Sequence, residues 1–339
     1  MRSTRFALFV CLAVAVPLQS TRCSAAGNSD ADDTVATDHE SGLNRVNLLS
    51  GLGLGPLEDD VKEAGDVEEA SWVNLGPTRR SGSRNCRGDH WQLMPRGLVY
   101  RPYLASSKES RIRGVWHEDK NEGNIWDISL GGQVGILRYG SSGNGRPTGW
   151  QLGMEGAGLV RLDWDENNDV MATDYRFGVP LTWGDEVVQY KVGYYHLSSH
   201  LGDEFLLKNP GYPRLNFSRD VLIFGTSLSP REKWRVYSEL GYAFRADVTE
   251  EWEVQFGIEY APEGATGIHG EPFAAVNGHL REEVDFGGNF VGQLGWAWRG
   301  SPASGMFRMG VEYFNGKNEQ FSFFDVSEQK VGFGMWYDY

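Results

Sequence analysis

Apolar residues alternate with small or polar residues along much of the chain after residue 110. The pattern is clearest in 331–339, where the apolar residues of one parity are Val331, Phe333, Met335, Tyr337 and Tyr339. Because successive side chains of a β-strand point to opposite faces, this alternation predicts a strand with one apolar face. A transmembrane barrel places that face against lipid and turns the other towards its lumen. An edge strand of a soluble β-sandwich is the alternative interpretation.

The same period recurs often enough to predict a complete barrel. Segments 234–245 and 251–260 alternate aromatic and aliphatic residues with charged ones, which a soluble core would seldom do. Parity predicts twelve strands, at 110–118, 124–139, 148–163, 169–183, 186–200, 214–229, 233–247, 251–262, 271–282, 288–299, 305–315 and 330–339. The expected fold is all-β, a transmembrane antiparallel up-and-down β-barrel over 110–339.

The face predicted to point inward carries ionisable side chains of both signs. They are Glu155, Arg161, Asp174, Arg176, Lys191, Glu239, Arg245, Glu253, Glu259, Arg308 and Glu312. Buried charges persist when they are paired, so this face predicts a lumen closed by ion pairs. A narrow channel for small solutes is the alternative, because polar lumens are also usual in channels.

The residues before the barrel indicate export. Residues 1–26 run from Arg2 and Arg5 through an apolar stretch to small residues, as in a secretory signal peptide. Residues 27–83 are acidic and poor in aromatics, which predicts a disordered leader. Residues 84–109 are expected to form an ordered periplasmic segment at the barrel's periplasmic end. Removal of the signal peptide would leave Cys86 as the single cysteine, so no internal disulfide is expected.

Location and partners follow from these features. We expect a bacterial outer-membrane protein in contact with outer-membrane lipids, inserted by the barrel assembly machinery. The formal net charge of −14 argues against a nucleic-acid partner, because phosphate backbones are bound by basic surfaces.

A histidine and a serine form the candidate catalytic pair. His196 and Ser198 share the parity of the lipid-facing residues on the strand 186–200. A hydroxyl beside an imidazole can supply a nucleophile and its general base when a third group orients the ring. If the next loop is centred near Leu207, residues 196 and 218 lie roughly opposite. Asp220 and Asn216 are then the candidate orienting groups.

The pair resembles that of two families of membrane enzyme. His196-Leu197-Ser198 is similar to the His-x-Ser of outer-membrane phospholipase A, a twelve-stranded barrel whose Ser, His and Asn act at the lipid-facing surface with calcium. It also resembles the His-x-Ser of lipid A deacylases, barrels that use Ser, His and Glu. The phospholipase pattern continues Ser-Asn-Gly, whereas this chain has Ser199 and His200 after Ser198. From Trp91 to Tyr339, the chain most resembles an uncharacterised bacterial outer-membrane β-barrel family of unknown function.

An acidic loop is the candidate metal site. Asp163, Asp165, Glu166 and Asp169 could bind calcium through carboxylate oxygens, although their order lacks the Gly and terminal Glu of an EF-hand loop. A hydrated acidic loop is the alternative, and no other cofactor is expected. Three functions therefore remain open: a closed barrel with a structural or lipid-binding or ligand-binding role, a serine-type lipid ester hydrolase, and a narrow channel.

Overall fold

The structure, a computed structural model, describes residues 88–141 and 143–339. The predicted signal peptide (1–26), the predicted leader (27–83) and Cys86 lie outside the described residues.

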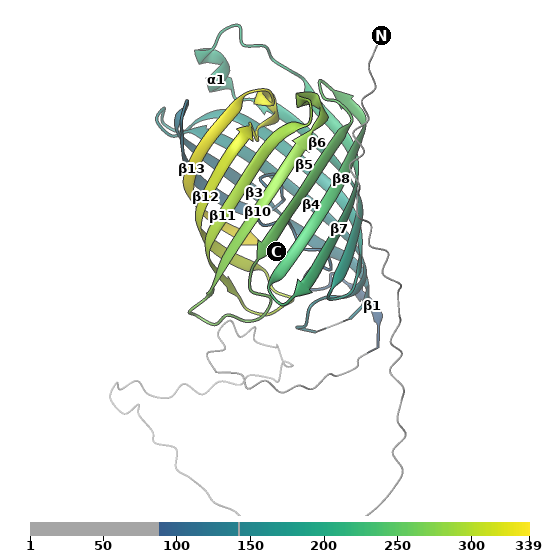
Figure 1. Ribbon diagram of the computed structural model, residues 1–339. Helices are drawn as coiled ribbons and strands as arrows, with labels where there is room; N and C mark the ends of the chain where they lie inside the picture. Colours follow the sequence, from purple (N-terminus) through teal and green to yellow (C-terminus); the bar gives the residue numbers. More distant parts are fainter. Residues whose placement is uncertain (1–87, 142) are drawn as a thin grey trace, which may run out of the picture. The chain divides into compact units, whose positions relative to one another are not determined.

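Most residues of the described chain lie in β-strands (Figure 1). The strands are β1 (His90–Leu93), β2 (Ile112–Asp119), β3 (Gly123–Gly140), β4 (Gly149–Asp163), β5 (Asp169–Gly184), β6 (Val188–Leu201), β7 (Phe217–Arg231), β8 (Trp234–Asp247), β9 (Trp252–Tyr260), β10 (Glu271–Arg281), β11 (Gly287–Arg299), β12 (Met306–Lys317) and β13 (Ser327–Asp338). Helix α1 (Asp203–Lys208) and the 3₁₀ turns η1 (Glu282–Val284) and η2 (Phe321–Phe323) complete the elements. None of these described helices is long and apolar enough to cross a membrane.

The strands β2 to β13 form a closed antiparallel barrel in which each strand pairs with its neighbours in the sequence. The ring closes where β13 pairs with β2, with Gly334 opposite Val115 and Tyr337 opposite Ile112. The predicted twelve-stranded up-and-down barrel is therefore confirmed. β1, which the sequence pattern did not predict, pairs with the last four residues of β3, with Trp91 opposite Tyr139.

The two ends of the barrel differ in their connections. Helix α1 and the 3₁₀ turns lie at one end, here called the long-loop end, at the top of Figure 1. The opposite end, here called the short-turn end, carries the tight connections β5–β6 and β7–β8. The connection between β9 and β10, residues 261–270, is long although it lies at the short-turn end.

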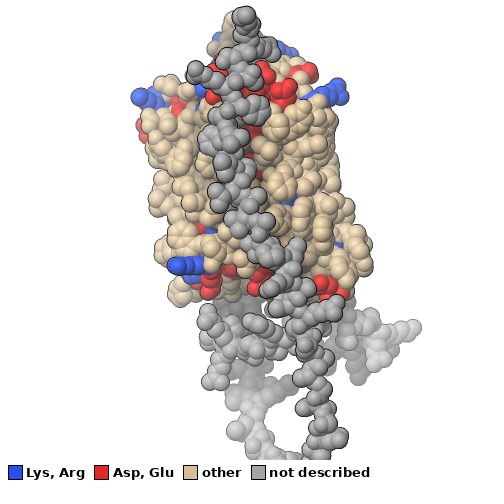
Figure 2. All heavy atoms as spheres, turned by 45° about the vertical axis from the view of Figure 1, so that its right-hand side comes forward, with Lys and Arg blue, Asp and Glu red and all other residues tan. Residues whose placement is uncertain are grey.

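The outer wall of the barrel is apolar between two polar rims. Phe256, Leu294 and Phe333 are among the aromatic and aliphatic side chains exposed on it. Charged residues gather at the upper and lower edges of the face in Figure 2, with an almost uncharged band between them. Aromatic pairs lie near both ends, for example Trp116 stacked on Trp126 and Trp150 on Trp183. The wall thus has the apolar band and aromatic girdles typical of a barrel that faces hydrocarbon.

Two β-bulges change the predicted facing of single residues. The pairing of β7 with β8 shifts between Asp220 and Val221, and Arg245 after the shift is exposed. The prediction that Arg245 points into the lumen was wrong, because the extra residue of a bulge reverses the parity beyond it. A second shift, between β4 and β5, turns Met171 inward, where it packs with Ile125. Strict alternation along the predicted strand 169–183 would place Met171 on the outer face.

A non-strand segment fills the lower lumen. Residues 98–111, here called the lumen segment, are nearly all buried. Tyr103 stacks on Tyr237 of β8 with ring centroids 3.9 Å apart, and its hydroxyl donates to Glu239 at 3.0 Å. The backbone N–H of Leu104 donates to Glu259 at 2.7 Å. No local sequence pattern indicates that this segment enters the barrel, because its anchors come from strands more than 130 residues away.

The upper lumen is filled from the long-loop end. Residues 318–323, between β12 and β13, are buried. Phe321 stacks on Phe217 of β7 with centroids 4.8 Å apart. Ser322 and Ser199 of β6 share a hydrogen bond at 2.7 Å between their hydroxyls. The loop is therefore folded back into the barrel and packed against its inner wall.

Buried ion pairs connect these fillings to the strands. Asp127 accepts from Arg161 at 2.8 Å and from Lys330 at 2.7 Å. Lys330 also donates to Glu319 at 2.6 Å and lies 3.2 Å from Glu328. All five side chains are buried. These five inward-facing charges are thus paired, as most buried charges must be.

Little free space remains between these side chains. Three of the internal cavities hold about 30, 20 and 20 Å³ of room for the centres of water molecules. One water molecule needs roughly 10–15 Å³ by this measure. Each of these cavities therefore has room for one to three water molecules, which describes a packed interior.

Candidate functional site

The predicted catalytic residues lie on the outer wall towards the long-loop end. On β6, His196 and Ser198 alternate with the buried residues Tyr195, Leu197 and Ser199, so both face outward. Their shared face, predicted from parity, is confirmed.

The register of β6 and β7 differs from the prediction by two residues. His196 pairs with Asp220, and Ser198 pairs with Ser218. The expectation that residue 218 lies opposite residue 196 was wrong. The connection contains helix α1, which places the centre of the hairpin one residue beyond Leu207. Asp220 is consequently the direct cross-strand neighbour of His196.

Asp220 orients the imidazole of His196. Its Oδ1 atom lies 2.8 Å from His196 Nδ1 and accepts a hydrogen bond from the Tyr194 hydroxyl at 2.6 Å. The His196 side chain is 41% exposed, and the Asp220 side chain is 17% exposed. Asp220 therefore holds one ring nitrogen, and within the described residues Nε2 has no hydrogen-bond partner, which is the arrangement that a general base requires.

The bulge in β8 adds a cation to this cluster. Arg245 pairs with Asp220 in the sheet and is exposed on the same outer face. Without the bulge it would point into the lumen. Sequence parity missed Arg245 for this reason. The bond between Tyr194 and Asp220 likewise depends on the register of β6 and β7, which parity does not give.

The cluster lies close to the upper rim. Asp220 is the fourth residue of β7, whose first residue is Phe217. With about 3.3 Å per residue and a tilt of about 40°, its Cα is roughly 8 Å below the start of the strand.

The other two predicted catalytic residues are less closely joined. Within the described residues, no hydrogen bond connects the Ser198 hydroxyl to His196. Asn216 is exposed, and its amide nitrogen lies 3.4 Å from Asp247 Oδ2. Asp220, not Asn216, is therefore the group that contacts the histidine.

The predicted calcium ligands do not converge on one point. Asp163 Oδ1 accepts from the backbone N–H groups of Asp165 and Glu166 at 3.1 and 3.2 Å. Lys208 of α1 lies 3.2 Å from Glu166 and 2.8 Å from Asp169. In the described part of the chain, no three His, Cys, Asp or Glu residues are grouped to hold a metal ion. Calcium binding by this loop stays a prediction without geometric support.

Asp165 has a separate role in this loop. Its carboxylate accepts hydrogen bonds from the backbone N–H of Asn124 at 2.9 Å and from the Asn124 side chain at 3.0 Å. The backbone bond, followed by the side-chain bond, holds the pKa of Asp165 below its usual value. The carboxylate therefore ties the β4–β5 loop to the start of β3.

Residues 89–339 match the family described as "Protein of unknown function (DUF1207)". The chain belongs to this family. The match covers the whole barrel together with β1 and the lumen segment. The family agrees with the resemblance to an outer-membrane barrel family of unknown function. No curated protein matches the sequence.

Solved structures of outer-membrane proteins are among those that the chain matches. Outer membrane phospholipase A from Escherichia coli is 12% identical, with a TM-score of 0.43 over 69% of this chain and 92% of that chain. The Salmonella typhi outer membrane phospholipase dimer with bound calcium is also 12% identical, with a TM-score of 0.43 over 67% and 90% of the two chains. The KdgM porin in complex with disordered oligogalacturonate is 9% identical, with a TM-score of 0.38 over 67% of this chain and 99% of that chain.

Proposed function

We propose that this protein is an integral outer-membrane barrel with a sealed lumen, whose outer wall binds membrane lipids. The observation that supports it is the contrast between the two faces of the wall. Phe256 and Leu294 are exposed outside, whereas Arg161 and Arg308 are fully buried inside. An apolar exterior of this extent is stable in hydrocarbon and would aggregate in water. Export and insertion by the barrel assembly machinery belong to the same proposal.

A conductance measurement tests the sealed lumen. The purified full-length protein is reconstituted into planar lipid bilayers, and current is recorded across a range of voltages. Because the lumen segment and residues 318–323 fill the interior, we expect insertion without a reproducible open-channel current. A steady unitary conductance that scales with the number of inserted molecules would refute the sealed lumen and favour the narrow channel.

A second candidate function is a lipid ester hydrolase, favoured by the bond between His196 Nδ1 and Asp220 Oδ1. In this mechanism, His196 Nε2 takes the proton of the Ser198 hydroxyl while the oxygen attacks the ester carbonyl. The ester C–O bond breaks, and the alcohol leaves with the proton held by His196. Water then hydrolyses the acyl-serine by the same route. The Ser198 hydroxyl would have to rotate towards Nε2 when a lipid binds.

The hydrolase is tested with purified protein, phospholipid and lipid A, with and without calcium. Released fatty acid is measured by mass spectrometry. We expect release by wild type and a fall of at least a hundredfold in Ser198→Ala, as for the loss of a nucleophile. Ser238→Ala is the matched control, because Ser238 also faces outward but lies away from His196 on β8. No release by wild type, or equal release by Ser198→Ala, would rule this function out.

A further inference from the structure

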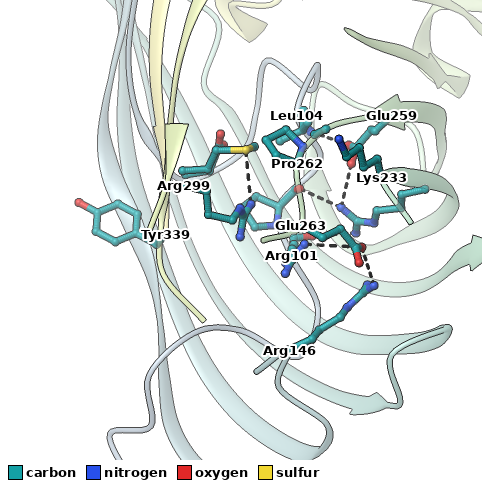
Figure 3. A pocket seen from close by; sticks show the side chains of 14 residues that line it. Arg101, Leu104, Arg146, Lys233, Glu259, Pro262, Glu263, Arg299 and Tyr339 are labelled. Carbon is teal, nitrogen blue, oxygen red and sulfur yellow. Dashed lines mark hydrogen bonds and ion pairs between the residues drawn. The ribbon is translucent and has the colours of Figure 1, made fainter. Parts of the chain in front are cut away.

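Three arginines converge on a pocket at the short-turn end of the barrel (Figure 3). Arg101 comes from the lumen segment, Arg146 from the β3–β4 turn and Arg299 from the end of β11. Arg101 and Arg146 both extend towards the carboxylate of Glu263 in the β9–β10 connection (Figure 3). The ring of Tyr339 points away from the pocket (Figure 3). Elements distant in sequence therefore bring three guanidinium groups to one place.

Two of these arginines, Arg101 and Arg146, share the carboxylate of Glu263. Arg146 Nη1 lies 2.8 Å from Glu263 Oε1, and Arg101 Nη1 lies 3.9 Å from the same oxygen. Arg146 also donates to Ser229 and Gln189, each at 3.1 Å. One carboxylate is thus shared by two guanidinium groups.

Arg299 is the least satisfied of the three. It is 8% exposed, and its guanidinium donates to the Ser304 carbonyl at 3.2 Å and to the Met306 sulfur at 3.5 Å. Within the described residues it forms no ion pair, and its Nε has no hydrogen-bond partner. The buried Nε of Arg146 also lacks a partner in this part of the chain. An unpaired buried guanidinium lowers the stability of the folded protein unless an anion is bound to it.

The other carboxylates of the pocket are already engaged. Glu259 lies 3.3 Å from Arg235 and accepts from the Leu104 N–H. Asp338 lies 2.8 Å from Arg111 and 2.7 Å from Arg308. Glu263 remains, within ion-pair distance of Arg101 and Arg146, while Arg299 has no ion pair among the described residues. Counted by ion pairs, the three guanidinium groups and one carboxylate leave a surplus of two positive charges.

Burial and the neighbouring positive charges also change the pKa of Arg101. Burial, together with the neighbouring charges of Arg299 and Arg146, lowers the pKa of Arg101 well below its usual value. An anion placed among the three would reverse this effect, because an opposite charge favours the charged form of the guanidinium.

We propose that this pocket binds a phosphate group. A phosphate dianion has two negative charges, which matches the surplus, and its oxygens can accept from several guanidinium groups at once. A carboxylate would neutralise only one of the two charges. The phosphate can belong to a free phosphorylated molecule or to the head group of a lipid, and the test separates these two sources.

The test measures binding to the folded full-length protein in maltoside micelles and Tris chloride, which contain no phosphate. Inorganic phosphate, dihexanoyl phosphatidic acid and acetate are titrated separately by calorimetry at matched ionic strength. We expect a phosphate-bearing probe to bind and acetate to bind at least tenfold more weakly. Binding of inorganic phosphate indicates a free phosphate ligand. Binding of the phosphatidic acid alone indicates a lipid head group.

Arginine variants show whether binding occurs in this pocket. Arg299→Gln and Arg101→Gln are each expected to weaken binding at least tenfold. Arg231→Gln is the matched control, because it removes the same charge from an exposed position at the end of β7. Circular dichroism and heat modifiability on gels identify any variant that does not fold, and the other variant then decides. Absence of binding by wild type, or unchanged binding in a folded Arg299→Gln or Arg101→Gln protein, would overturn the proposal.

Discussion

At the scale of single residues, the barrel interior depends on charges that each serve several partners. Asp127 contacts Arg161, Lys330 and His117 at distances of 2.7 to 3.1 Å. Its side chain is 2% exposed. In such a network the loss of one carboxylate leaves more than one cation without compensation, and buried cations are costly when unpaired.

Neutralising Asp127 should therefore strongly destabilise the barrel. We expect Asp127→Asn to lower the free energy of unfolding by about 3–5 kcal/mol, the usual effect of breaking a buried ion pair. The measurement is urea unfolding of protein folded into lipid vesicles. Glu166→Gln is the control, because the Glu166–Lys208 pair is largely exposed and should contribute little. Equal stability of the two variants would show that the buried network does not hold the barrel together.

The residue scale also shows what the sequence could predict of the candidate site. Parity alone placed His196, Ser198 and Asp220 on one outer face, because a period of two is fixed by strand geometry. The pairing of His196 with Asp220, and the arrival of Arg245 beside it, depend on helix α1 and on a bulge. The pairing and the position of Arg245 are determined by the partner strand and the loop. The residue pattern along one strand carries no information about either.

At the scale of elements, the strands were predictable and the fillings of the lumen were not. Predicted and observed strands such as 233–247 and Trp234–Asp247 agree to within a few residues, because alternation is a local signal. β1 is only four residues long, too short to show a period. The lumen segment has no period either, and its position is set by Glu239 and Glu259 on distant strands.

Arg111 joins the lumen segment to the barrel wall. Its guanidinium donates to the carbonyls of Tyr103 and Leu104 and forms an ion pair with Asp338 at 2.8 Å. We expect Arg111→Gln to raise the amide hydrogen exchange of the lumen segment at least tenfold. Exchange in β6 and β9 should change little, because their ladders are formed with other strands.

Hydrogen exchange read by mass spectrometry checks this prediction in the folded protein. Arg231→Gln removes one exposed arginine from the same end and should leave the lumen segment protected. If the segment stays equally protected in Arg111→Gln, its other contacts suffice to hold it. Arg111 would then not be the anchor that we describe.

At the scale of the whole molecule, the barrel is defined by two faces of opposite character. Its exterior is apolar between charged rims (Figure 2). Its interior is filled by the lumen segment, by residues 318–323 and by buried charged side chains. The outer face accounts for the lipid contact that we propose, and the inner face accounts for the absence of conduction that we expect. The His196–Asp220 cluster lies on the outer face, and the arginine pocket lies at the short-turn end.

Photolabelling with a lipid that carries a diazirine in its acyl chain tests the central claim most directly. The native protein is reconstituted with this lipid and irradiated, and the labelled residues are identified by mass spectrometry. We predict labels on outward residues of the wall, such as Phe256, Val276 and Leu294, and none on the inward residues Tyr237 and Phe273. Labels on the inward residues, or an unlabelled wall, would contradict the claim that this barrel holds its apolar exterior in a membrane.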